Sequence, residues 1–178
     1  MNLAQMFEHC RSTPSDIYEH LPTFVAMCDD LQAKKVVELG TRTGVSTVAW
    51  LYGLAGTGGH LWSVDTDAQP PIGEHKNWTF VQGNDCTQET YSQLPGDVDI
   101  VFIDTSHAYE HTLQELTLYR WLVRPGGKIV LHDTELPYPE GVIGKPFPVK
   151  RAVTEWCDAE GLEWVNHENC FGLGIISL

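Results

Sequence analysis

Four acidic residues each lie at or beside the end of a short apolar run. They are Glu38, Asp65, Asp104 and Asp133. Two histidines accompany the later acids, with His107 three residues after Asp104 and His132 directly before Asp133. Carboxylates accept paired hydrogen bonds and bind hard cations such as Mg²⁺. One acid after a strand is usually a turn or helix cap, but four at equivalent places predict a shared functional edge.

The stretch VVELGTRTGVST, residues 36–47, predicts a turn that holds a ligand. Gly40 and Gly44 bracket three polar residues after an apolar run, and glycine lets a ligand approach the backbone closely. A phosphate loop would end in Gly-Lys-Ser/Thr, and a dinucleotide fingerprint would read Gly-x-Gly-x-x-Gly. The sequence matches neither pattern, so a nicotinamide-dependent enzyme is disfavoured and a different nucleoside-binding turn is left.

Strand-like and helix-like patterns alternate along the chain. Strands are predicted at 36–39, 60–65, 77–83, 97–104, 128–133, 162–168 and 171–178. Helices are predicted at 3–10, 15–31, 44–54, 86–93, 108–122 and 149–160. Ser15 is the predicted N-cap of the second helix, and Pro22 predicts a break near Leu21. The alternation predicts an α/β fold with a mostly parallel sheet, in which ligands bind beyond the carboxyl ends of the strands.

Composition limits the class of protein. The chain has 178 residues, which predicts a single domain, 1–178. It has 11 Lys+Arg against 24 Asp+Glu, a net charge of −13, and scattered cations, so a nucleic-acid partner is not expected. No apolar run is long enough for a membrane span and the N-terminus lacks a signal pattern, so a cytoplasmic location is expected. Five cysteines without a Cys-x-x-Cys pair predict free thiols.

A family resemblance rests on several motifs in order. Glu-Leu-Gly-x-x-x-Gly-x-Ser at 38–46 is similar to the first motif of class I S-adenosylmethionine-dependent methyltransferases, and SVDTD, QGNDC and RPGGKIVLHD are similar to the later ones. The resemblance covers about residues 33–178. It implies a Rossmann-like, seven-stranded, mostly parallel sheet with helices on both faces and a C-terminal antiparallel hairpin. The cofactor implied is S-adenosylmethionine.

The same resemblance implies which residues hold the cofactor. Asp65 would accept hydrogen bonds from both ribose hydroxyls, and Asp85 would contact the adenine. Glu38 would touch the cofactor's ammonium group or order the turn by accepting backbone N–H bonds. The implied cofactor residues are Glu38, Gly40, Thr41, Arg42, Gly44, Ser46, Asp65, Thr66, Asp85, Cys86 and Asp104.

The end of the fourth strand, Asp-x-x-His, resembles the metal-dependent O-methyltransferases of the macrocin and cephalosporin-hydroxylase-like group. This implies Asp104 and Asp133 as ligands of a divalent metal, with Mg²⁺ as the expected ion. His132 stands where relatives often carry a carboxylate, and an imidazole ligand would shift the preference toward Mn²⁺, Fe²⁺ or Zn²⁺. His107 is the candidate general base beside Asp104; alternatively it caps the helix near Ala108. His111 is expected on the surface.

The predicted function is metal-assisted methyl transfer to a hydroxyl of a small molecule: a sugar, a polyketide-like compound or a phenol. A cofactor-binding module without activity and a metal-independent N-methyltransferase are the alternatives. Residues 1–32 form a predicted helical cap on the core at 33–178, where they close the cleft or contact a second copy in a homodimer. The loop 134–148, with Tyr138, Ile143 and Phe147, is either a lid over the acceptor or a surface connection.

Overall fold

A seven-stranded sheet forms the centre of the computed structural model, which describes residues 1–137 and 147–178. Its strand order is β3-β2-β1-β4-β5-β7-β6. The strands are β1 (Lys35–Leu39), β2 (His60–Asp65), β3 (Trp78–Gln82), β4 (Val98–Ile103), β5 (Val123–His132), β6 (Trp164–His167) and β7 (Leu173–Ser177). The first five pair in parallel, and β7 lies antiparallel between β5 and β6. The predicted fold class is therefore confirmed.

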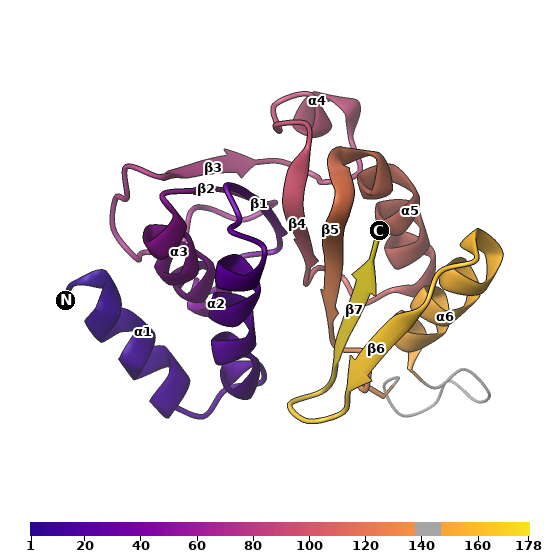
Figure 1. Ribbon diagram of the computed structural model, residues 1–178, viewed down its shortest axis with the longest axis horizontal. Coiled ribbons are helices and arrows are strands. Elements are labelled where there is room, and N and C mark those ends of the chain that lie inside the picture. The colour runs from indigo at the N-terminus through magenta and orange to yellow at the C-terminus, as the bar shows by residue number, and fades with distance from the viewer. Residues whose placement is uncertain (138–146) are drawn as a thin grey trace.

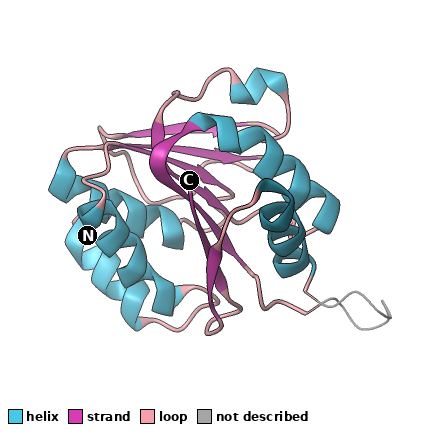
Figure 2. Ribbon diagram, turned by 45° about the vertical axis from the view of Figure 1, so that its right-hand side comes forward, coloured by secondary structure: helices cyan, strands magenta, loops and turns pink. Residues whose placement is uncertain are grey.

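Helices cover both faces of the sheet (Figures 1 and 2). One face carries α1 (Leu3–Ser12), α2 (Leu21–Asp30) and α3 (Val45–Thr57), and the other carries α5 (Tyr109–Tyr119) and α6 (Pro148–Glu160). The short α4 (Gln88–Tyr91) follows β3, and the 3₁₀ turns η1 (Tyr18–His20) and η2 (Arg120–Leu122) precede α2 and β5. Each layer has its own apolar core, because β1 and β4 are apolar on both faces.

The N-terminal helices differ from the prediction. Of the helix expected over 15–31, residues 21–30 are confirmed as α2, but the part before Leu21 and the Ser15 cap were wrong, because the chain makes only the 3₁₀ turn η1 there. The predicted break near Leu21 is confirmed, because Pro22 occupies the first turn of α2, where its missing N–H costs no hydrogen bond. Within α1–α3, Phe24 stacks on Trp50 with ring centroids 4.3 Å apart.

The strand after Pro125 also differs from the prediction. The expected turn at 125–127 lies within β5, which runs unbroken from Val123 to His132, and the register against β4 shifts between Val98 and Ile100. Gly126 has a φ of +78° there and donates its N–H to the Leu178 carbonyl. The turn thus joins β5 to the chain's last residue.

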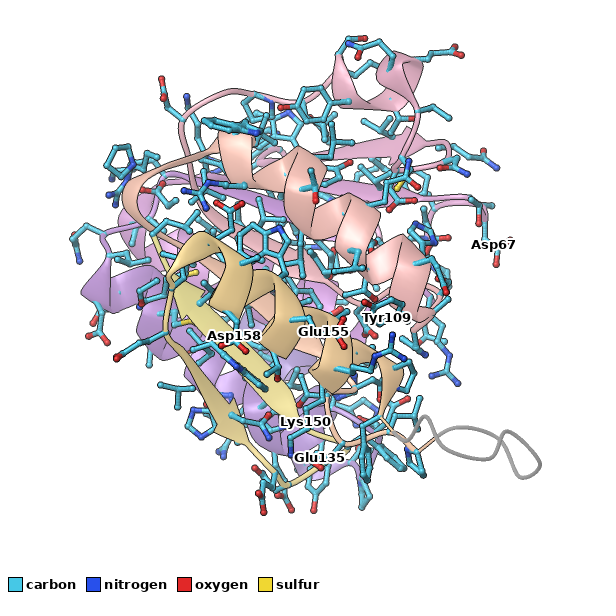
Figure 3. The ribbon with its side chains drawn as sticks, turned by 90° about the vertical axis from the view of Figure 1, so that its right-hand side faces the viewer. Asp67, Tyr109, Glu135, Lys150, Glu155 and Asp158 are labelled. Atoms are coloured by element: carbon cyan, nitrogen blue, oxygen red, sulfur yellow. The ribbon has the colours of Figure 1, made fainter. Side chains whose placement is uncertain are left out.

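On the face of the sheet that carries α5 and α6, side-chain contacts join these helices to each other and to the segment after β5 (Figure 3). Tyr109 donates to Glu155, and Lys150 pairs with Glu135, whose carboxylate also accepts from Asn166 at 2.6 Å. Of the predicted lid loop, Tyr138 and Ile143 lie outside the described residues. Phe147 is described and stands directly before α6. Across residues 1–137 and 147–178, no helix has the length and apolar character needed to cross a bilayer.

Candidate functional site

A cavity of about 610 Å³ opens at the carboxyl ends of β1, β2, β4 and β5. Its lining includes eight of the predicted cofactor residues: Gly40, Thr41, Arg42, Ser46, Asp65, Thr66, Asp85 and Asp104. His107 and Asp133 also line it. The other predicted residues, Glu38, Gly44, Cys86 and His132, are not among its lining residues within the described ranges. The parallel sheet brings these distant residues together because its strand ends share one edge.

The turn between β1 and α3 is held open by backbone geometry. Gly40 and Gly44 have φ values of +86° and +84°, a conformation that side chains disfavour. A Cβ on Gly40 would lie 1.9 Å from the Asp104 carbonyl oxygen, so the turn lies directly against the end of β4. Both predicted glycines are therefore required by the local structure.

Asp65 fixes the same turn from the end of β2. Its Oδ2 accepts hydrogen bonds from the Thr41 N–H at 2.7 Å, the Thr41 hydroxyl at 2.9 Å and the Arg42 N–H at 3.0 Å. Its Oδ1 accepts from the Asp67 N–H at 3.0 Å. Partial burial alone would raise the pKa of Asp65, but these bonds lower it. The carboxylate is thus ionised and shapes the turn, in addition to the ribose contact predicted for it.

Glu38 lies beneath the turn and is fully buried. The predicted acceptance of backbone N–H bonds was wrong: its carboxylate instead accepts from the hydroxyls of Ser46 at 2.7 Å, Thr47 at 2.9 Å and Ser63 at 2.6 Å. Burial raises the pKa of Glu38 to about 7, although the hydroxyls oppose the shift. Glu38 therefore ties α3 and β2 to β1 from behind the cavity.

The raised pKa of Glu38 predicts a pH-dependent stability. An acid whose folded pKa of about 7 exceeds the unfolded value of 4.5 holds its proton in the folded state, so stability falls as pH rises between these values. We expect Glu38→Gln to abolish the contribution of Glu38 to this pH-dependent loss of stability. That contribution to the free energy of unfolding is about 3 kcal/mol. Urea unfolding at pH 4.5 and pH 8 measures it. The same change at the exposed Glu163 is the control, and an equal pH response in both variants would contradict the assignment.

Two carboxylates and two imidazoles meet at the ends of β4 and β5. His107 Nε2 lies 3.2 Å from Asp104 Oδ1 and 2.9 Å from Asp133 Oδ2. His132 approaches the same two oxygens from behind, with Nδ1 at 3.5 Å and 3.2 Å. Its Nε2 lies 2.9 Å from the Cys170 carbonyl and 3.2 Å from that of Asp16. His132 is thus fully surrounded by acceptors.

The charges of this group depend on one another. Burial disfavours the charged forms of both imidazoles, but the two acids outweigh it and raise the pKa of His107 to about 9 and that of His132 to about 10. Burial would likewise raise the pKa of Asp133, and the imidazoles instead lower it. His107 and Asp133 also have φ values of +55° and +62°. Such backbone conformations are costly for these residues and are concentrated at functional sites.

The group has the donors of a divalent metal centre. One ligand atom each from Asp104, His107 and Asp133 lies within 4.8 Å of the others. Two carboxylate oxygens and an imidazole nitrogen suit Mg²⁺, Mn²⁺ or Fe²⁺. The imidazole at the cavity is His107, whereas the ring of the predicted ligand His132 is 2% exposed and faces backbone carbonyls on its other side.

Two residues near the Asp85 end of the cavity, His111 and Glu115, were not predicted from sequence as part of the site. His111, expected on the surface, lines the cavity and pairs with Asp85 at 3.1 Å. Glu115, one helical turn further along α5, is fully buried. Burial and a hydrogen bond to Asp85 raise the pKa of Glu115 to about 9. The spacing of four between His111 and Glu115 on a helix following β4 was the available signal, since such residues share one face.

Comparisons with known proteins agree with the predicted family. Residues 37–134 match a family model described as a methyltransferase domain. The O-methyltransferase ankF of Aspergillus thermomutatus is 27% identical over 120 residues, which cover 62% of this chain. Those residues cover 49% of ankF, so the chain spans about half the length of this relative.

Solved structures share the fold. The methyltransferase PaMTH1 of Podospora anserina, bound to S-adenosylhomocysteine (SAH), matches with a TM-score of 0.66 at 15% identity, covering 98% of this chain and 86% of the other. MycE, a methyltransferase from the mycinamycin biosynthetic pathway in complex with Mg and SAH, matches with a TM-score of 0.74 at 18% identity. The match covers 99% of this chain and 54% of the MycE chain. At these identities the likeness extends to the fold alone.

Proposed function

Because the chain belongs to the methyltransferase-domain family, we propose that it transfers a methyl group from S-adenosylmethionine to a hydroxyl of a small molecule with the help of a divalent metal. The observation that carries the proposal is the cavity itself, which joins the glycine turn and Asp65 to the acidic group at Asp104 and Asp133. Cofactor and metal would therefore meet at one edge of the sheet. MycE, in its complex with Mg and SAH, supports this pairing.

The cofactor would lie along the turn from Gly40 to Thr43, with its ribose near Asp65 and its adenine toward Asp85. Ser15 supports a ligand in this cavity. Ser15 lines the cavity, and its hydroxyl is buried and has no hydrogen-bond partner among the described residues. A buried hydroxyl without a partner is costly, and a bound ligand would satisfy it.

The N-terminal segment would close over the cofactor. Ser15, Asp16 and Ile17 line the cavity, and Asp16 pairs with Arg42 of the turn at 2.8 Å. The side chain of Arg42 is 81% exposed and that of Asp16 is 41% exposed, so the contact can open at small cost. We therefore assign residues 1–32 to a cap that admits and covers the cofactor.

Asp104, His107 and Asp133 would hold the metal, and their donor atoms fit it. The ion, when bound, would lower the pKa of the acceptor hydroxyl and orient it. Asp104 and Asp133 hold His107 by its Nε2, and this atom must release its bonded proton before it can bind the ion, so a metal-bound His107 would not also act as the base. The remaining task of the chain is alignment, since the sulfonium carries its own leaving group.

The first test is titration of SAH into the purified protein, with and without Mg²⁺. We expect binding, and we expect Asp65→Ala to weaken it at least about tenfold, because the variant loses the bonds that order Thr41 and Arg42 and the acceptor for the ribose. Asp158→Ala, at an exposed acid near the end of α6, is the matched control. Absence of SAH binding by the wild-type protein under both conditions would refute the proposed function.

His107→Ala is expected to reduce turnover at least about tenfold while SAH affinity stays unchanged, because the His107 side chain contacts the acids Asp104 and Asp133 and not the bonds that order the cofactor turn. The assay follows labelled methyl groups from S-adenosylmethionine onto a panel of phenols, sugars and polyketide-like alcohols. His75→Ala, on the loop before β3, is the control. Unchanged turnover in His107→Ala would remove His107 from the catalytic group.

A second candidate function is metal-independent transfer, to an amine or a hydroxyl. One observation favours it: the two imidazoles have raised pKa values and can balance the charges of Asp104 and Asp133 without an ion. In this case turnover would survive chelation and would rise as the pH approaches about 9, where His107 loses its proton. Loss of turnover on chelation, with recovery on adding Mg²⁺ or Mn²⁺, would exclude this candidate.

A further inference from the structure

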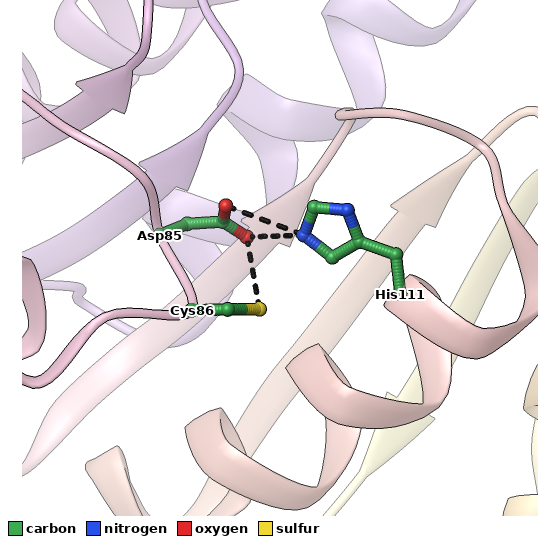
Figure 4. A group of neighbouring side chains, drawn as sticks. All are labelled: Asp85, Cys86 and His111. Atoms are coloured by element: carbon green, nitrogen blue, oxygen red, sulfur yellow. Dashed lines mark hydrogen bonds and ion pairs between the residues drawn. The ribbon is translucent and has the colours of Figure 1, made fainter.

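A second group of ligand-type side chains lies at the Asp85 end of the cavity (Figure 4). Asp85 and Cys86 follow β3, and His111 points toward them from the first turn of α5. His111 Nε2 lies 3.1 Å and 3.3 Å from the two oxygens of Asp85, and the Cys86 sulfur lies 3.7 Å from Asp85 Oδ2. One donor atom from each residue lies within 4.8 Å of the other two.

Glu115 is a fourth donor beside this group. Its Oε1 lies 3.8 Å from His111 Nε2 and accepts a hydrogen bond from the Thr105 hydroxyl at 2.7 Å. Its Oε2 is buried and receives no hydrogen bond in the part of the chain that is described, and its acidic neighbour is Asp85, with which it can share a proton. A fully buried carboxyl oxygen facing another acid needs a proton or a cation, because burial of an unbalanced charge is costly.

We propose that Asp85, Cys86, His111 and Glu115 form a second metal site that binds zinc or a similar borderline divalent cation. A tetrahedral zinc site with bonds of about 2.0–2.3 Å places its ligand atoms about 3.3–3.6 Å apart. The separations of Asp85 from His111 and Cys86 are close to these values. Sulfur and imidazole donors favour Zn²⁺ or Co²⁺ over Mg²⁺, so this site and the Asp104 group would select different ions.

The site would compete with the cofactor. Asp85 and His111 line the cavity that the proposed function assigns to S-adenosylmethionine, so this consequence rests on that function. An ion held by Asp85 and His111 removes the groups that face the adenine end. Zinc would then inhibit methyl transfer by lowering the affinity for the cofactor.

Cobalt tests the site directly, because a thiolate bound to Co²⁺ absorbs in the near ultraviolet. We expect this absorption when Co²⁺ is titrated into the metal-free full chain. The Asp104 group contains no sulfur and cannot produce it. Cys86→Ser should abolish the absorption, whereas Cys10→Ser on α1 should retain it. Absence of the band in the wild-type protein, or its persistence in Cys86→Ser, would overturn the proposal.

Two further measurements make the test independent of a folding defect and of the proposed function. Glu115→Gln keeps the size of the side chain, and we expect it to weaken cobalt binding at least about tenfold while the cysteine remains in place. Undiminished affinity would remove Glu115 from the site. Saturating SAH should raise the Co²⁺ concentration needed for the band, and no change would refute the competition. A cobalt band in a protein that binds no SAH would leave the metal site standing and the proposed function refuted.

Discussion

Asp133→Asn is expected to weaken Mn²⁺ binding at least about 100-fold, and to reduce methyl transfer in proportion, while SAH affinity stays close to that of the wild-type protein. The change removes the charge from the carboxylate that contacts both imidazoles, at 2.9 Å to His107 and 3.2 Å to His132. Replacing residues that merely support a metal ligand costs about 10–100-fold in affinity, so loss of a ligand should reach the upper end. Mn²⁺ binding measured by calorimetry needs no acceptor and is the primary readout.

The control for Asp133→Asn is the same change at Asp158, which is exposed near the end of α6 (Figure 3). Asp133 also has a φ of +62°, a conformation that asparagine tolerates well, so the variant should fold. Loss of SAH binding together with Mn²⁺ binding would point to a collapsed cavity instead of a missing ligand. Unaltered Mn²⁺ binding would contradict the role of Asp133 in the metal centre and strengthen the metal-independent candidate.

The sheet could be predicted from sequence because its strands are short, largely apolar runs, four of which have an acid at or beside their carboxyl end. β1 and β4 lie in the middle of the sheet, are covered on both faces, and are mostly apolar, with Glu38 and Asp99 as buried exceptions. The first part of the helix expected over 15–31 was wrong because apolar residues at helical spacing also occur in an irregular segment that packs on the core, as Ile17 does. Periodicity records burial and does not distinguish these cases.

The site residues at strand ends could be predicted from sequence. The side chains that contact them were harder to predict. Asp65 and Asp104 follow from the rule that strand ends share an edge, yet the partners of Glu38 come from α3 and β2 and share no sequence pattern with it. His111 was misplaced because its neighbour Asp85 is 26 residues earlier, a contact that only the crossover of the chain creates. Contacts of this kind depend on the packing of α5 against the sheet.

Gly40→Ala is expected to lower the free energy of unfolding by about 3 kcal/mol or more and to abolish SAH binding. The methyl group would lie 1.9 Å from the Asp104 carbonyl oxygen and 2.8 Å from its carbon, and backbone atoms cannot move aside as a flexible side chain can. The φ of +86° adds a cost of its own for any residue with a Cβ. For a chain of this size, a loss of about 3 kcal/mol corresponds to a melting temperature roughly 6–12 °C lower.

Gly56→Ala is the matched control, because Gly56 lies on the exposed side of α3 and a Cβ there meets nothing within 4 Å. Alanine favours the helix over glycine by up to about 1 kcal/mol, so this variant should be as stable as the wild-type protein or slightly more so. Thermal unfolding and SAH titration of both variants separate the two effects. A Gly40→Ala protein that melts normally and binds SAH would mean that β1 and β4 can spread apart at their ends. In that case the contact between the turn and Asp104 would not be needed to hold the proposed cofactor and metal sites together.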